Sequence, residues 1–134
     1  MNITVSTCYL SVDDHEKALW FYRDVLGLTV KSDVGYESMR WVTVVAPAQP
    51  DLSIVLGPPN PDASPADREA IANLMAKGLY GWLLFATDNC DATFERIRAA
   101  GAEVVQEPID QAYGMRDCAF RDPAGNMLRF AQAK

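Results

Sequence analysis

Apolar and polar residues alternate close to the start of the chain, where residues 3–12 read ITVSTCYLSV. Cys8, Leu10 and Val12 fall on one face of an extended segment, and the residues between them are mostly polar. This period of two predicts a β-strand with one buried face and one face that is not part of the same core.

The pattern changes to a helical period over residues 13–27. Asp13 or Asp14 can cap the start of a helix there, and Gly27 can end it. The apolar stripe consists of Ala18, Leu19, Tyr22, Val25 and Leu26. Three further strands are predicted at about 28–34, 39–46 and 51–57, separated by turn residues.

Residues 58–79 read as a connector between two similar halves. Its first part is rich in proline, and Ser64-Pro65 followed by Gly78 then predicts a short helix over 65–77. After it the same order of elements returns. A strand, a helix and three strands are predicted at 81–87, 88–101, 102–108, 115–123 and 126–132.

The order β-α-β-β-β therefore occurs twice, which predicts an α+β fold built from two tandem βαβββ modules. We expect a single domain over 1–134, with module one at 1–57, the connector at 58–79 and module two at 80–134. Two half-open sheets of this kind are expected to face each other around a shared cleft.

Composition narrows the classes of partner. The net charge of −6 argues against nucleic acid and anionic membranes as partners. The apolar runs are too short to span a membrane, and the N-terminus lacks the features of a signal peptide. Three cysteines without a pairing framework are expected to be free thiols, so a cytoplasmic location is predicted.

Three stretches resemble a known family. SVDDHEKALWFYRDVLGL is similar to the entry motif of the vicinal oxygen chelate superfamily, which holds glyoxalase I, extradiol dioxygenases and bleomycin resistance proteins. FATDNCDATFERIRAAGAEVVQEP and GMRDCAFRDPAGNMLRF resemble its second-half motifs. The resemblance covers nearly the whole chain outside 58–78. It implies a curved, barrel-like mixed sheet around a cleft, with the helices outside.

In the enzymes of this superfamily, the first and last strands of each module hold a divalent metal. The corresponding positions here are Thr7, Ser53 or Val55, Trp82 and Arg129. None of these side chains is a good ligand: hydroxyls bind metals weakly alone, indole only donates, and guanidinium stays protonated. The single histidine, His15, lies at a helix start. We therefore expect no metal and no cofactor.

The resemblance then favours the metal-free bleomycin-resistance-like branch. A small-molecule binding protein that sequesters an antibiotic or a metabolite, with a role in antibiotic resistance, is the first hypothesis. A metal-dependent or metal-free lyase, isomerase or dioxygenase of the same superfamily is the alternative, and whether catalysis remains is left open. In a third hypothesis the cleft is vestigial and the protein acts by association.

The alternation of each strand predicts which side chains line the cleft. The lining is aromatic and apolar with scattered polar groups, which suits an aromatic or planar small molecule. Trp20, Trp41 and Trp82 could instead be ordinary core or dimer contacts. The predicted ligand-binding residues are Thr7, Tyr9, Trp41, Thr43, Val55, Trp82, Asp117, Arg121, Met127 and Arg129.

Arg129 lies in the middle of the last predicted strand, on the face away from Leu128 and Phe130. It could pair with Asp117 or hydrogen-bond a ligand's carboxylate or carbonyl, and a plain structural salt bridge is the other interpretation. The resemblance also implies a homodimer, with first-strand or connector residues at the interface.

Overall fold

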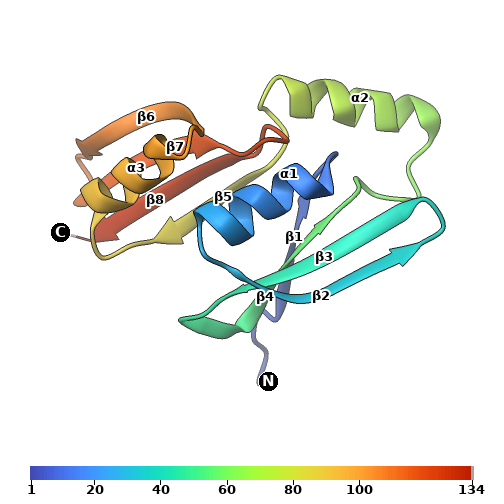
Figure 1. Ribbon diagram of the computed structural model, residues 1–134, viewed down its shortest axis with the longest axis horizontal. Coiled ribbons are helices and arrows are strands. Elements are labelled where there is room, and N and C mark those ends of the chain that lie inside the picture. Colours follow the sequence, from blue (N-terminus) through green and yellow to red (C-terminus); the bar gives the residue numbers. More distant parts are fainter. Residues whose placement is uncertain (134) are drawn as a thin grey trace. The chain divides into compact units, whose positions relative to one another are not determined.

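Two four-stranded mixed sheets carry the strands of this protein (Figure 1). The computed structural model describes residues 1–133. A first compact unit comprises Met1–Ile71, and a second begins at Ala72. Each unit holds one sheet, and each is described by itself.

The first unit contains one βαβββ module. Its elements are β1 (Thr7–Ser11), α1 (His15–Leu19), a π-helix η1 (Trp20–Val25), β2 (Thr29–Tyr36), β3 (Met39–Ala46) and β4 (Gln49–Gly57). The strand order is β1-β4-β3-β2, with β1 parallel to β4 and the other pairs antiparallel. Helix α2 (Pro65–Ala76) follows and runs across the boundary between the units.

The second unit repeats the module. Its elements are β5 (Trp82–Ala86), α3 (Cys90–Ala99), β6 (Glu103–Asp110), β7 (Met115–Arg121) and β8 (Met127–Ala133). The order β5-β8-β7-β6, with β5 parallel to β8, matches the first sheet strand for strand. The predicted α+β fold of two tandem βαβββ modules is confirmed. The single domain and its boundaries stay a prediction.

The buried face of each sheet is the one that the sequence alternation indicates. In the first unit, Leu10, Val42, Val44, Ile54 and Leu56 are buried on the same face, and α1 lies against β4. In the second, α3 contacts β6, β7 and β8. The Phe94 and Phe120 rings meet there at 5.3 Å, and Phe85 stacks on Phe130 at 5.1 Å. Each such buried side chain stabilises the fold by about 1.5–3 kcal/mol.

The first helix differs from its prediction in the second half. Asp14 caps α1 by accepting hydrogen bonds from the backbone N–H groups of Glu16 and Lys17, at 3.0 and 3.1 Å. From Trp20 onward the helix is π, with the N–H of Leu26 donating to the carbonyl of Phe21. Phe21 and Tyr22 are both fully buried. The predicted apolar stripe included Tyr22 but left out Phe21, although Ala18, Phe21, Tyr22 and Val25 have the i, i+3, i+4, i+7 spacing of one helix face.

The strand predicted over residues 3–12 is shorter in the structure. Only Thr7–Ser11 pair with β4, and residues 3–6 are exposed. Val12 is nonetheless buried, and its N–H donates to the carbonyl of Gly57 at 2.8 Å. Within residues 1–133, no helix combines the length and the apolar character needed to cross a membrane.

The turn before β8 is a hydrogen-bonded structural unit. Asp122 Oδ1 accepts from the N–H groups of Ala124 and Asn126, and Oδ2 accepts from Asn126 Nδ2 at 2.8 Å. Gly125 has a φ of +94°, and a Cβ there would collide with the carbonyl of Met75 in α2. The DPAGN motif therefore shapes the turn and lets the end of α2 pack against it.

Candidate functional site

One face of each sheet carries side chains that the core of its unit does not cover, and we call it the open face. The first open face carries Thr7, Tyr9, Trp41, Thr43 and Val55; the second carries Trp82, Leu84, Asp117, Arg121, Met127 and Arg129. Tyr9 is 74% exposed and Trp82 is 68% exposed. The ten residues proposed as ligand-binding fall on these two faces. Their contact with a ligand stays a prediction.

The strand register decides which residue of the first unit corresponds to Arg129. In the second sheet Leu84 lies opposite Arg129, and Trp82 lies opposite Met127. In the first sheet Tyr9 lies opposite Val55, and Thr7 lies opposite Ser53. Both strand pairs have five residues in the same parallel register, so Val55, rather than Ser53, is the counterpart of Arg129.

The positions that hold a metal in enzymes of this kind do not fit one here. Thr7 and Val55 offer at most one hydroxyl, Trp82 offers a donor, and Arg129 already has its cation paired with Asp117. Within residues 1–133, no group of three His, Cys, Asp or Glu side chains could hold a metal ion.

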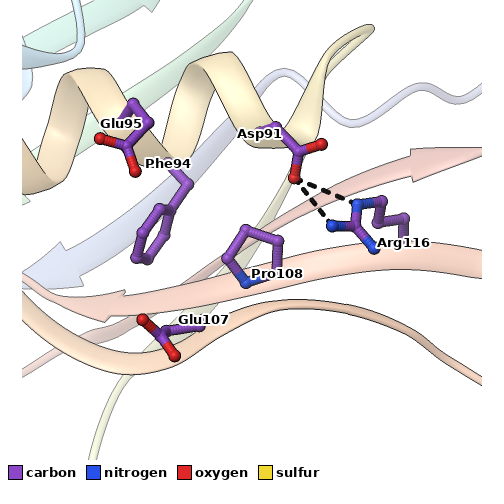
Figure 2. Close-up of a pocket in the computed structure, with 6 residues that line it drawn as sticks. All are labelled: Asp91, Phe94, Glu95, Glu107, Pro108 and Arg116. Atoms are coloured by element: carbon purple, nitrogen blue, oxygen red, sulfur yellow. Dashed lines mark hydrogen bonds and ion pairs between the residues drawn. The ribbon is translucent and has the colours of Figure 1, made fainter.

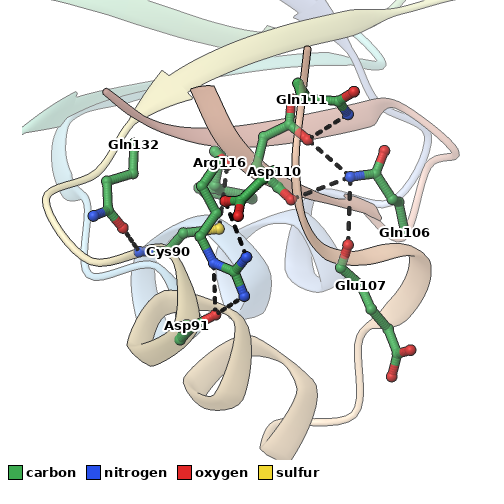
Figure 3. Close-up of polar contacts among 10 residues, drawn as sticks. Cys90, Asp91, Gln106, Glu107, Asp110, Gln111, Arg116 and Gln132 are labelled. Carbon is green, nitrogen blue, oxygen red and sulfur yellow. Dashed lines mark hydrogen bonds and ion pairs between the residues drawn. The ribbon is translucent and has the colours of Figure 1, made fainter. Parts of the chain in front are cut away.

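Asp117 is the centre of a polar cluster on the second open face. Its side chain is 1% exposed. Its Oδ1 accepts hydrogen bonds from Gln106 Nε2 at 2.8 Å and Gln111 Nε2 at 2.9 Å, and its Oδ2 accepts one from the Tyr113 hydroxyl at 2.9 Å. Figure 3 shows the side chains of Gln106 and Gln111 approaching the same point from two segments. A buried carboxylate needs such partners, because desolvation of an unpaired charge is costly.

These contacts decide the charge state of Asp117. Burial alone raises the pKa of its carboxyl, but the hydrogen bonds from Gln111, Gln106 and Tyr113 and the charge of Arg129 lower it further than burial raises it. The net result is a pKa below the ordinary value, so Asp117 is an anion at neutral pH.

Arg129 joins the cluster from β8. Its Nη1 donates to Gln106 Oε1 at 2.8 Å and lies 3.3 Å from Asp117 Oδ1. The pairing of Arg129 with Asp117 that the sequence suggested is confirmed. The side chain is still 25% exposed, so the pairing does not remove it from the open face.

Gln106, Gln111 and Tyr113 were missed by the sequence analysis. Gln106 sits in β6 where the register with β7 shifts on both sides, and such irregularities re-aim side chains. Gln111 and Tyr113 belong to the turn between β6 and β7, where polar residues are ordinarily solvent-exposed. The available signal was a polar QAYG turn directly before the strand that carries Asp117.

Arg121 and Trp41 are held by their own chain. Arg121 donates to the carbonyl of Gly78 at 2.9 Å and lies 3.1 Å from Glu103, so it ties the end of the connector to β7. A Cβ on Gly57 would lie 2.6 Å from Cδ1 of Trp41, so this indole lies against the β4 backbone. Both residues are half-buried, and these contacts give each a structural role.

A hollow of about 380 Å³ lies on the opposite side of the second sheet, beside α3 (Figure 2). It is lined by Asp91, Phe94, Glu95, Glu107, Pro108 and Arg116. Arg116 pairs with Asp91 at 2.9 Å and with Asp110 at 3.2 Å, so the cation in the lining is already neutralised. None of the residues predicted to bind a ligand lines this hollow.

The three cysteines are free thiols, as the sequence predicted. Cys90 and Cys118 are buried next to each other and share a hydrogen bond. Burial raises the pKa of both, and in Cys118 burial together with Cys90 and Asp117 raises it to about 12. Thiols held in this protonated state are poor nucleophiles.

A family model and a curated protein both match nearly the whole chain. The family model described as "Glyoxalase/Bleomycin resistance protein/Dioxygenase superfamily" matches residues 4–130. YurT of Bacillus subtilis (strain 168) is 29% identical over 132 residues, which cover 98% of this chain and 99% of YurT.

Two solved structures are similar over the full length. The crystal structure of UcmS2 has a TM-score of 0.88 and 30% identity, covering 99% of this chain and 100% of UcmS2. That of TnmS3, an antibiotic binding protein from Streptomyces sp. CB03234, has a TM-score of 0.78 and 30% identity, covering 100% of this chain and 99% of TnmS3.

Proposed function

The chain belongs to the glyoxalase/bleomycin resistance protein/dioxygenase superfamily, and we propose that it is a metal-free protein that binds a planar aromatic small molecule. The molecule would be an antibiotic or a metabolite that the protein sequesters. The observation that carries this proposal is the second open face, where Trp82 and Leu84 are exposed and the cation of Arg129 stays partly exposed.

This arrangement matches what such a ligand needs. Large apolar side chains that gather on an exposed face mark a binding site more often than chance exposure. Leu84 is 55% exposed and, two residues from Trp82 on the same strand, shares its face. The indole of Trp82 can stack on an aromatic ring of the ligand. The guanidinium of Arg129 can donate directional hydrogen bonds to oxygen atoms of the same ligand.

A structural relative supports the proposal that the chain binds a small molecule. TnmS3 is described as an antibiotic binding protein, and its similarity to this chain extends over the full length of both. The transfer of that role to this chain is part of the proposal. Met127 and Arg121 would contribute further ligand contacts on the second open face. Thr7, Tyr9, Trp41, Thr43 and Val55 stay predicted ligand-binding residues of the first open face.

We also propose a homodimer that works in the cytoplasm. Tyr9 in β1 is largely exposed, which suits an interface made by first-strand or connector residues. Light scattering at micromolar concentration should give twice the chain mass of 14.8 kDa. A monomer at that concentration would contradict the proposed dimer and would leave the proposal of ligand binding unaffected.

Binding can be tested with fluorescent planar probes. N-phenyl-1-naphthylamine is neutral, and 8-anilinonaphthalene-1-sulfonate is a related anion. The folded wild-type chain should bind at least the anionic probe saturably, with one site per chain. Trp82→Ala should weaken binding about tenfold, the loss of roughly 1–1.5 kcal/mol of aromatic contact. The matched variant Trp20→Ala changes an indole on η1 and should leave the affinity unchanged.

Two results would refute the proposal of a metal-free binding protein. One is the absence of saturable binding by wild-type protein whose near-ultraviolet circular dichroism shows it to be folded. The other is about one tightly bound nickel, zinc, iron or manganese per chain in elemental analysis of untagged protein, which would favour an enzyme of the same superfamily.

A further inference from the structure

The turn between β6 and β7 reaches the second open face through one side chain. Tyr113 is 69% exposed, yet its hydroxyl donates to the buried Oδ2 of Asp117 at 2.9 Å. The phenol ring therefore runs from the turn to the polar cluster with most of its surface free. A large aromatic ring held in place at its far end in this way forms a fixed wall at the rim of the face.

Arg129 is held in an equally definite orientation. Its Nη1 is used by Gln106 Oε1 and Asp117 Oδ1. Among residues 1–133, Nε and Nη2 have no hydrogen-bond acceptor, and a quarter of the side chain is exposed. A guanidinium fixed at one nitrogen presents its remaining donors at little further cost in side-chain entropy.

The charge that the cluster offers to a ligand is therefore positive. Asp117 has three hydrogen-bond donors besides Arg129, and with 1% of its surface exposed it is closed to an incoming molecule. Arg121 on the same face already has Glu103 as a partner. A cationic ligand would be repelled by the charge of Arg129, because the carboxylate of Asp117 is covered and cannot pair with the ligand.

We propose that Tyr113 is an unrecognised wall of the binding site and that Arg129, oriented by Asp117 and Gln106, selects planar aromatic ligands that carry an anionic or carbonyl oxygen beside the ring. This inference rests on the proposed function and deepens it. It adds two positioning residues, Gln106 and Asp117, and assigns the class of ligand. Leu84, directly opposite Arg129 in the ladder, would contact the apolar part of the same ligand.

The two probes differ in the group that Arg129 would recognise, which separates the inference from simple apolar binding. The wild-type chain should bind the anionic sulfonate probe about tenfold more tightly than the neutral amine, the difference made by a charge-assisted hydrogen bond. Arg129→Met should remove that preference, with affinity for the neutral probe kept within about twofold. Arg116→Met is the matched control, because Arg116 is an ion-paired arginine of β7 beside the hollow on the other side of the sheet.

Arg129→Met leaves the buried Asp117 without its cation, so its fold must be checked by thermal melting. Arg129→Lys keeps a cation for Asp117 and removes the fork of donors. It should reduce the preference for the sulfonate probe about threefold or more, with little loss of stability. Preserved preference in Arg129→Lys and Arg129→Met alike would overturn the role given to Arg129.

Tyr113 is tested in the same titration. Tyr113→Ala should weaken both probes about three- to tenfold. Tyr113→Phe keeps the ring but loses the hydrogen bond that fixes it, so it should weaken both by less, about two- to threefold. Equal probe affinities of wild type and Tyr113→Ala would contradict the proposal that Tyr113 forms a wall of the binding site. Wild-type protein that binds neither probe would refute the proposed function itself. Binding of both probes with no effect of either residue would refute only the inference drawn from Tyr113 and Arg129.

Discussion

Nη1 of Arg129 lies 3.3 Å from Oδ1 of Asp117, a carboxylate that the surrounding side chains almost completely cover. This ion pair crosses from β8 to β7 on the second open face. A buried pair of this kind adds little net stability over apolar residues, although breaking it is costly. Leu84 lies opposite Arg129 in the ladder, so under the proposed function this ion pair would lie next to the ligand.

The first prediction concerns Asp117 and acid. Asp117→Asn should lower the free energy of unfolding at pH 7 by about 1.5–3 kcal/mol, because charged hydrogen bonds and the counter-ion of Arg129 are lost. The pKa of Asp117 is lowered in the folded state, so its contribution is present above the ordinary value of 3.8 and is lost as the pH falls through the folded pKa. The difference between wild type and variant should therefore shrink from pH 5 toward pH 2 in urea titrations.

Asp91→Asn is the matched control for that experiment. Asp91 pairs with Arg116 in an exposed position, where a salt bridge contributes about 0–1 kcal/mol. A difference for Asp117→Asn that is no larger than that of Asp91→Asn, or that is constant with pH, would contradict the role assigned to the cluster.

The second prediction concerns the phenol of Tyr113. Its hydrogen bond to Asp117, with burial and the negative charge of Asp117, raises the pKa of Tyr113 above 10, and the charge of Arg129 offsets part of this. Asp117→Asn should bring that pKa back toward 10. Tyrosine-selective NMR over an alkaline titration would follow it, with Tyr113→Phe to assign the signal. An unchanged pKa in the variant would show that the hydrogen bond is not formed in solution.

The third prediction concerns thiol reactivity. Cys90 and Cys118 are buried and their pKa values are raised, so neither should react with Ellman's reagent in the folded protein at pH 8. Cys8 is half-buried, with its pKa also raised by burial, and should react slowly. Three thiols per chain should appear after unfolding in guanidinium chloride. Rapid native reaction of two or more thiols would show that the core around α3 opens readily.

The fourth prediction separates backbone strain from a steric clash. Gly101 and Gly125 have nearly the same φ, +96° and +94°, but a Cβ at Gly101 meets nothing within 4 Å, while one at Gly125 meets the carbonyl of Met75. Gly101→Ala should cost about 1–2 kcal/mol from the left-handed backbone alone. Gly125→Ala should cost about 2–5 kcal/mol, because the clash adds to that strain. Equal melting temperatures for the two variants would show that α2 does not pack on the turn as described.

The alternation of apolar and polar residues determined the fold. Leu10 and Val42 in the first sheet, and Leu128 and Phe130 in the second, each read as part of a buried strand face. A strand places every second side chain on the same side, and the structure buries all four. The repeat of β-α-β-β-β and the face that carries Trp82 and Arg129 follow from the same local rule. Helix caps are also local: the sequence offered Asp13 or Asp14 as the cap, and the structure uses Asp14.

Tertiary structure decided what local rules leave open. The π-helix over Trp20–Val25 is one example, because the apolar pattern there fits an ordinary α-helix and does not indicate the wider turn. The choice of Val55 over Ser53 as the counterpart of Arg129 needed the parallel register of β1 with β4, which joins residues more than forty positions apart. The partners of Asp117 come from β6, its turn and β8, and only the paired sheet with its shifted β6 register brings Gln106, Tyr113 and Arg129 to one carboxylate. Sequence predicts which face a side chain occupies, because that depends on its neighbours along the chain; which groups it meets there depends on distant segments and is settled only when they pack.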